Sequence, residues 1–303
     1  MKKVLFYIEN KWAFGAIHYG LCKVLYSHGI HCDLLNWDLD YTRDEFKFLI
    51  DTYDSIVTTP VFVSKLHLKY DVPLNKIIAV AHGQWDVLHA RRNASFDFYP
   101  ELKSFTVISN ILKQKCIEWG ISVTPIVTET GINFDFFYNK PSSKLKIVGY
   151  GGAKSTYNFA GEEIKRGHLV EESVLGIGLE LKSHNFYNFL CMPGYYKTID
   201  ALVMSSSEEA GGLPIMEAAA AGKLVLGTPV GYFEEHSDMK NKARGGILLP
   251  LKEKDFISEL SEQLIKYSKD KNLYKLKCLQ IQEYARENYD WSKKLYSWLN
   301  LLA

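Results

Sequence analysis

Two glutamates, Glu209 and Glu217, flank a glycine-containing segment in the second half of the chain. Gly211 and Gly212 carry no side chains, so backbone amides in this segment can approach a ligand closely. Pro214 suits the first turn of a helix, where its missing N–H costs no hydrogen bond. The free N–H groups and the positive dipole end of that helix favour phosphate or sugar oxygens. The segment therefore predicts an anion- or sugar-binding loop with a carboxylate on either side. The rival interpretation is two solvated carboxylates near a helix start, where the dipole also favours negative charge.

Short apolar runs alternate with helical patterns along the first half of the chain. We expect strands at 4–8, 32–35, 55–57, 77–81, 105–108 and 125–127, and helices at 16–28 and 110–119. Such alternation predicts a mostly parallel sheet with helices on both faces.

The segment 139–144 has the composition of a linker, and the alternation restarts after it. Strands are expected at 147–150, 179–181, 201–204, 224–226 and 247–249, and helices at 168–175, 214–221, 253–288 and 291–302. The predicted fold is α/β, with two Rossmann-like, doubly wound domains at 1–140 and 144–288 and a final helix at 290–303. Because such sheets bind ligands beyond the carboxyl ends of their strands, we expect a bipartite substrate in a cleft between the domains.

The segment from Ser205 to Gly231 resembles the E-x7-E signature of retaining glycosyltransferases of family 4 (glycosyl transferases group 1), with Glu209 and Glu217 at the required spacing. Segments 192–206, 246–250 and 289–292 resemble further elements of that family, as do 109–113 and 129–137. The resemblance implies the two-domain GT-B fold, and it implies that the final helix crosses back onto the N-terminal domain.

By this resemblance, Glu217 would accept hydrogen bonds from the ribose hydroxyls of a nucleotide-sugar donor. Glu209 would face the transferred sugar and stabilise positive charge at its anomeric carbon. The amides of Gly211, Gly212 and Leu213 would bind sugar hydroxyls and the diphosphate. A fixed carboxylate and amide dipoles would thus meet each charge where it develops in the transition state. Tyr196 is expected to support the sheet edge and not to touch the donor.

The diphosphate also needs a cation. Lys165-Arg166-Gly167 resembles the phosphate-binding lysine–glycine pair of the family, with Arg166 in the place of the lysine, which a bidentate phosphate contact tolerates. Family members usually have an arginine directly after the Val-Gly of the preceding strand, whereas this chain has Tyr150. Lys154 could compensate for the missing cation.

Two residues of the first half are further candidates. Gly15 is expected between the first strand and the first helix, where glycine lets the backbone approach phosphate. His82 follows the strand 77–81 and could orient the acceptor or the donor sugar, or relay a proton. The rival interpretations are a packing glycine and a core histidine.

Composition narrows the functional class. The 36 basic and 35 acidic residues nearly cancel and form no basic arm, which argues against nucleic-acid binding. Five cysteines without a C-x-x-C pair argue against a disulfide framework and a zinc site, and for the cytoplasm. Asp38-Leu-Asp40 has the D-x-D pattern of a metal-binding motif but lies far in sequence from the E-x7-E segment, so no metal is expected.

The first apolar run stops at Glu9, which is too soon for a signal peptide. Any membrane contact would therefore be peripheral, at the inner face.

The sequence and its resemblance to family 4 together predict a cytoplasmic, retaining, metal-independent hexosyltransferase. It would move a sugar from a UDP- or GDP-sugar to a glycan, lipid-linked or other hydroxyl acceptor, with the nucleotide-sugar as co-substrate and no other cofactor. The resemblance implies that the leaving phosphate oxygen would take the proton of the acceptor, so that no dedicated base is required. Two alternatives stay open: a nucleotide-sugar epimerase, and a non-catalytic nucleotide-sugar-binding protein. Tyr150, in place of the usual arginine, favours the second of these.

Overall fold

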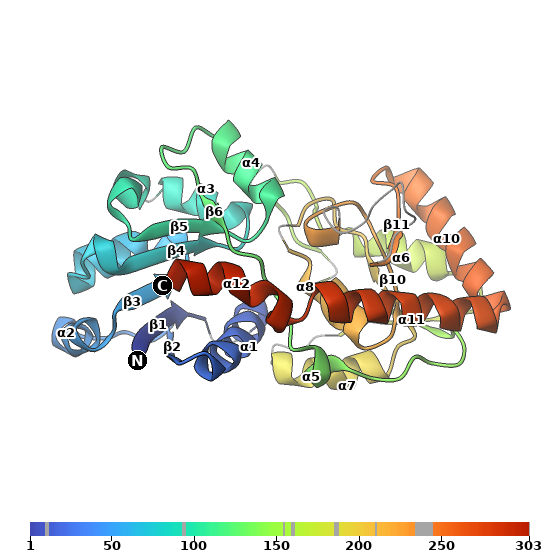
Figure 1. Ribbon diagram of the computed structural model, residues 1–303. Helices are drawn as coiled ribbons and strands as arrows, with labels where there is room; N and C mark the ends of the chain where they lie inside the picture. Colours follow the sequence, from blue (N-terminus) through green and yellow to red (C-terminus); the bar gives the residue numbers. More distant parts are fainter. Residues whose placement is uncertain are drawn as a thin grey trace. The chain divides into compact units, whose positions relative to one another are not determined.

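The computed structural model describes residues 1–9, 12–92, 95–153, 155–158, 161–184, 188–209, 211–233 and 245–302 (Figure 1). The chain forms two compact units, Met1–Gly131 with Trp291–Ala303, and Ile132–Asp290. The division lies at Gly131, before the linker expected at 139–144, so the segment 132–140 belongs to the second unit. Contacts with the end of that unit explain the difference: Ile132 donates its N–H to the Tyr289 carbonyl at 2.8 Å, and Phe134 donates to the Asp290 carboxylate at 3.1 Å.

Unit 1 is built on a parallel sheet. Its strands are β1 (Lys2–Ile8), β2 (Ile30–Asn36), β3 (Ser55–Thr58), β4 (Ile77–Ala81), β5 (Ser104–Val107) and β6 (Ile126–Val127), in the order β2-β1-β3-β4-β5-β6. Its helices are α1 (Trp12–Ser27), α2 (Arg43–Thr52), α3 (Gln84–Arg92), α4 (Asn110–Glu118) and α12 (Trp291–Leu302). Short helical turns lie at Pro60–Phe62, Lys65–Lys69, Leu74–Lys76 and Ser95–Glu101.

Both faces of this sheet are covered, which explains the continuous apolar runs of its strands. Successive residues of a strand point to opposite faces. Phe6 of β1 meets His18 of α1 and Trp298 of α12, with ring centroids 5.3 and 6.3 Å apart, and α1 and α12 lie side by side (Figure 1). The next residue, Tyr7, meets Phe46 of α2 on the other face, with ring centroids 5.5 Å apart.

Unit 2 repeats this architecture. Its strands are β7 (Ile147–Tyr150), β8 (Glu180–Lys182), β9 (Ala201–Met204), β10 (Leu224–Gly227) and β11 (Ile247–Leu248), paired in parallel in the order β11-β10-β9-β7-β8. Its helices are α5 (Phe134–Phe137), α6 (Gly167–Val174), α7 (Met192–Lys197), α8 (Leu213–Ala220), α10 (Glu253–Lys269) and α11 (Lys271–Asn288), with a short helical turn at Phe189–Cys191. α10 packs against α6, and α11 packs against α8 and β10. The α/β class predicted from the sequence is confirmed.

Several helical features differ from the expectation, and α3, α5 and α7 are among the helices that were not expected. The region 253–288 is two helices, because Asp270 leaves the helical conformation and its carboxylate accepts hydrogen bonds from the N–H groups of Asn272 and Leu273, both at 3.0 Å. α2 was not expected, although Thr42 and Glu45 form a capping box at its start.

Among the helices of the described residues, none combines the length and the apolar character needed to span a bilayer.

Gly131 offers a test of how α12 joins unit 1. A Cβ at this position would lie 2.9 Å from Cδ2 and 3.0 Å from Cα of Trp291, which is 1% exposed. We expect Gly131→Ala to lower the free energy of unfolding by about 1–3 kcal/mol through overpacking, measured by denaturant titration. Gly194→Ala is the control, because a Cβ at Gly194 would meet no atom within 4 Å. Equal unfolding curves for the two variants would contradict the packing argument.

Candidate functional site

The strand order of unit 2 brings two loops to one edge of the sheet. β7 and β9 pair in parallel, with Tyr150 opposite Val203, so the chain leaves both strands at the same edge. The loop after β7 runs to Arg166 and the loop after β9 runs to Gly212. A hydrogen bond from the Ser207 N–H to the Ile164 carbonyl, at 2.8 Å, ties the loops together. The carboxyl edge of such a sheet is where ligands bind.

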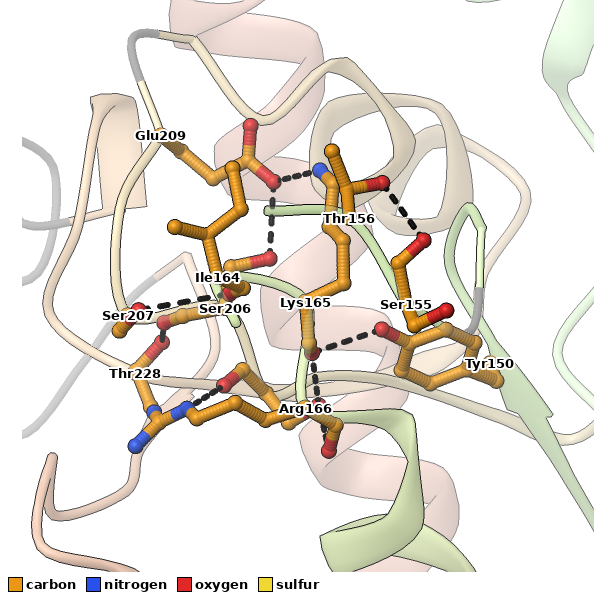
Figure 2. A network of polar contacts seen from close by, with 11 residues as sticks. Tyr150, Ser155, Thr156, Ile164, Lys165, Arg166, Ser206, Ser207, Glu209 and Thr228 are labelled. Carbon is orange, nitrogen blue, oxygen red and sulfur yellow. Dashed lines mark hydrogen bonds and ion pairs between the residues drawn. The ribbon is translucent and has the colours of Figure 1, made fainter. Parts of the chain in front are cut away.

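Glu209 and Lys165 form an ion pair across these loops (Figure 2). The same carboxylate oxygen, Oε1, also accepts a hydrogen bond from the Ser206 hydroxyl at 2.8 Å. The Glu209 side chain is 17% exposed and that of Lys165 is 20% exposed, so solvent screens the pair less than a surface pair. One fixed negative charge and one positive charge therefore lie together at the edge of the sheet.

Arg166 is turned away from this pair. Its guanidinium donates from Nε to the Ser205 carbonyl at 2.8 Å and from Nη1 to the Leu251 carbonyl at 2.7 Å. The residue is 6% exposed, and burial lowers the pKa of its guanidinium. The resemblance put Arg166 in the place of the lysine, but the structure brings Lys165 to Glu209 instead. The reason lies in the backbone, since Arg166 has left-handed angles, φ 50° and ψ 42°, at the start of α6.

Tyr150 also contacts the loop that carries Lys165. It is 2% exposed, and its hydroxyl donates to the Lys165 carbonyl at 2.8 Å. Lys154, the other residue considered in connection with the missing arginine, lies outside the described residues.

The glycines of the signature lie where the sequence predicts them, before α8. Gly212 caps the helix with φ 75° and ψ 45°, a conformation that residues with side chains rarely adopt. α8 then begins at Leu213, with Pro214 in its first turn. The Gly211 carbonyl accepts the Tyr232 N–H at 3.2 Å. The N-terminus of α8 thus follows Glu209 closely in the chain. The first N–H groups of a helix have no partner within the helix.

Glu217 lies inside α8 and is 3% exposed. The hydroxyl of Tyr196, on α7, donates to its Oε2 at 2.7 Å. Burial raises the pKa of the Glu217 carboxyl to about 8, and the hydrogen bond from Tyr196 opposes that rise. Neither signature glutamate is therefore a solvated surface carboxylate. Tyr196, expected at the sheet edge, is also the hydrogen-bond partner of Glu217.

In unit 1, His82 lies directly after β4. Its ring meets Phe14 and His18, with centroids 4.9 and 5.1 Å apart, and neither ring nitrogen has a hydrogen-bond partner among the described residues. Burial lowers the pKa of His82 well below its usual value, so the ring is neutral. A neutral imidazole can donate one hydrogen bond and accept another, as binding a hydroxyl requires. The His82 N–H donates to the Asp86 carboxylate of α3 at 2.7 Å, which fixes the backbone beneath the ring.

His18 was missed by the sequence analysis. It is fully buried in α1, and its Nδ1 lies 2.9 Å from the Phe14 carbonyl, so Nδ1 carries the proton and Nε2 is an acceptor. Nε2 has no partner in the described part of the chain, and burial lowers the pKa of the ring to about 4. No motif marks this residue; only the fold brings it to His82.

Gly15 does not lie where the sequence analysis expected it. It is buried within the first turn of α1 and does not lie in a loop, because the helix begins at Trp12 and not at Ala16.

Glu217→Gln should remove a pH dependence of stability. Between the ordinary glutamate pKa of 4.5 and the raised value of about 8, the folded chain keeps a proton that the unfolded chain has lost. The free energy of unfolding of the wild type therefore falls as the pH rises through this window, by an amount on the order of a few kcal/mol. Glu217→Gln should lose less stability between pH 5 and pH 8 than the wild type, as measured by denaturant titration.

The exposed Glu262→Gln is the control for this experiment, and its pH profile should follow that of the wild type. A Glu217→Gln profile parallel to both would contradict a raised pKa of the Glu217 carboxyl in the folded chain.

Comparison with known proteins identifies the family of this chain. The model of the family described as "Glycosyl transferases group 1" matches residues 104–270. No curated protein matches the chain. Among solved structures, HepE of Anabaena in complex with UDP superposes with a TM-score of 0.70 at 13% identity, covering 100% of this chain and 99% of that one.

Two other solved structures share the fold. Sucrose-phosphate synthase of Thermosynechococcus elongatus has a TM-score of 0.72 at 13% identity, covering 99% of this chain and 98% of that one. The catalytic domain of starch synthase IV from Arabidopsis thaliana, bound to ADP and acarbose, has a TM-score of 0.74 at 11% identity, covering 100% and 98%. The match of the family model over more than half of the chain, together with two parallel sheets of the GT-B kind, shows that this chain belongs to the glycosyl transferases group 1 family.

Proposed function

We propose that this chain transfers a sugar from a nucleotide-sugar donor to a hydroxyl acceptor, with retention and without a metal ion. The observation that carries the proposal is the Glu209–Lys165 pair at the carboxyl edge of the unit 2 sheet, just before the N-terminus of α8. It places a fixed carboxylate, a cation and helix-terminal N–H groups on neighbouring segments.

Each of these groups meets a charge of the transition state. As the bond from the anomeric carbon to the phosphate oxygen breaks, positive charge grows on the sugar and Glu209 stabilises it. The departing diphosphate gains negative charge, which Lys165 and the N–H groups of Gly212 and Leu213 stabilise. The acceptor oxygen forms the new bond to the anomeric carbon, and its proton passes to the leaving phosphate oxygen.

Glu217 binds the ribose hydroxyls of the donor in this proposal. Its partner Tyr196 can hold one carboxylate oxygen while the other accepts a ribose hydroxyl. His82, a neutral ring with both nitrogens unpartnered among the described residues, contacts a substrate hydroxyl in the same proposal. Its low pKa makes a hydrogen-bonding role better suited to it than that of a general base.

The donor is proposed to be a UDP- or GDP-sugar. HepE, which shares the fold, has been crystallised with UDP and with UDP-glucose, whereas starch synthase IV has been crystallised with ADP. The acceptor is proposed to be a glycan or a lipid-linked sugar, bound by unit 1. A panel of UDP-, GDP- and ADP-sugars therefore covers the candidates.

Glu209→Gln tests the proposed chemistry. Loss of the carboxylate charge should lower the rate of transfer by about 100-fold or more, as loss of one preorganised electrostatic group does elsewhere. Donor binding should stay within a few-fold of the wild type, because Lys165 remains available to the diphosphate. The measurement is release of nucleoside diphosphate from the donor panel, with and without a chelator, using cell extract as the source of acceptor.

Glu208→Gln is the matched control, since it removes the neighbouring carboxylate, for which no contact with Lys165 is seen. Full activity of Glu209→Gln would refute the assigned role, and inhibition by the chelator would refute the metal-independent mechanism. Donor epimerisation without release would favour the epimerase, and binding without either reaction would favour the binding protein.

A further inference from the structure

We propose that Tyr150 is a positioning residue for the donor diphosphate, acting through the main chain of Lys165. The inference rests on the proposed function, in which Lys165 is the cation for the diphosphate. It explains how a chain with tyrosine at the end of β7 still presents a fixed positive charge at this edge of the sheet.

Two hydroxyls hold the turn that carries Lys165. The Tyr150 hydroxyl donates to the Lys165 carbonyl at 2.8 Å (Figure 2). The Ser205 hydroxyl lies 2.7 Å from the same oxygen and 2.9 Å from the Arg166 carbonyl. A serine hydroxyl has one hydrogen to divide between these two acceptors. Tyr150 therefore supplies the Lys165 carbonyl with a donor of its own.

This turn needs to be held because its backbone is strained. Arg166 has a φ of 50°, and Asp71 is the other non-glycine residue with positive φ in the described part of the chain. Such a conformation persists only where its surroundings enforce it. The Arg166 guanidinium, bonded to the Ser205 and Leu251 carbonyls, holds the turn from the other side.

The strained turn sets the direction of Lys165. Figure 2 shows the side chains of Lys165 and Arg166 leaving the turn in different directions, with that of Lys165 reaching Glu209. The two hydrogen bonds of the Arg166 guanidinium oppose a change of the backbone angles in this turn. A loosened turn would leave the ammonium group in place for a smaller fraction of the time, and ligand affinity falls by that fraction.

The experiment measures binding of UDP, GDP and ADP to the full chain by calorimetry. Tyr150→Phe keeps the buried ring and removes the hydroxyl, so we expect the diphosphate that binds the wild type to bind about 5- to 10-fold more weakly, as the loss of one hydrogen bond allows. The corresponding nucleoside, which lacks phosphates, should bind both proteins equally. This difference separates positioning of Lys165 from general damage to the site.

Tyr274→Phe is the matched control. Tyr274 is fully buried in α11, and its hydroxyl donates to the Asp200 carbonyl at 2.9 Å, at the start of β9 and so at the opposite edge of the sheet. Both Phe variants lose one buried bond to a carbonyl and should lose similar thermal stability. Only Tyr150→Phe should lose diphosphate affinity.

A double-mutant cycle with Lys165→Gln gives the sharpest result. If Tyr150 acts through Lys165, then Tyr150→Phe should cost nothing further once the lysine is gone. An unchanged diphosphate affinity of Tyr150→Phe, or an equal loss in the Lys165→Gln background, overturns the inference and leaves the proposed function standing. If the wild type binds none of the three diphosphates, the proposed function fails and the inference fails with it.

Should Tyr150→Phe not fold, Ser205→Ala removes the other hydroxyl from the turn. It enters the same double-mutant cycle with the same expectation.

Discussion

The parallel pairing of β7 with β9 is the constraint on which the rest of unit 2 depends. Because Tyr150 lies opposite Val203, the loops that follow both strands leave the sheet at one edge, and residues about forty positions apart become neighbours. The Gly151 N–H donates to the Val203 carbonyl at 3.2 Å, extending the pairing into the first loop. Glu209 and Lys165 can meet only because these two loops are held together in this way.

Burial divides four ionisable groups of this site into two pairs. Glu209 and Lys165 keep some exposure and remain within reach of a ligand at the edge of the sheet. Arg166 and Glu217 are almost fully buried, and each is held by partners from other segments: Arg166 by main-chain carbonyls, Glu217 by the Tyr196 hydroxyl. A buried polar or charged group without such partners would be costly, so these contacts help to hold Arg166 and Glu217 in place. We infer that Arg166 supports the turn while Lys165 serves the donor.

Much of the fold could be predicted because buried parallel strands are short, continuous apolar runs, as in β4, which lies at 77–81 as expected. The spacing of Glu209 and Glu217 could also be recognised from the sequence. Side-chain directions were not, since the choice between Lys165 and Arg166 depends on a left-handed residue held by Ser205 from another loop. His18 was missed for a similar reason, because only the packing of α1 on the sheet brings it to His82.

The central claim is that unit 2 binds the donor diphosphate and that Lys165 is its cation. The most direct measurement is the affinity of the full chain for nucleoside diphosphates, comparing the wild type with Lys165→Gln and with Lys197→Gln, an exposed lysine on α7. The account predicts that at least one diphosphate binds, that Lys165→Gln weakens it by about 10-fold or more, as loss of a charged hydrogen bond does, and that Lys197→Gln does not. Equal affinity in all three proteins, or no binding to the wild type, would contradict it.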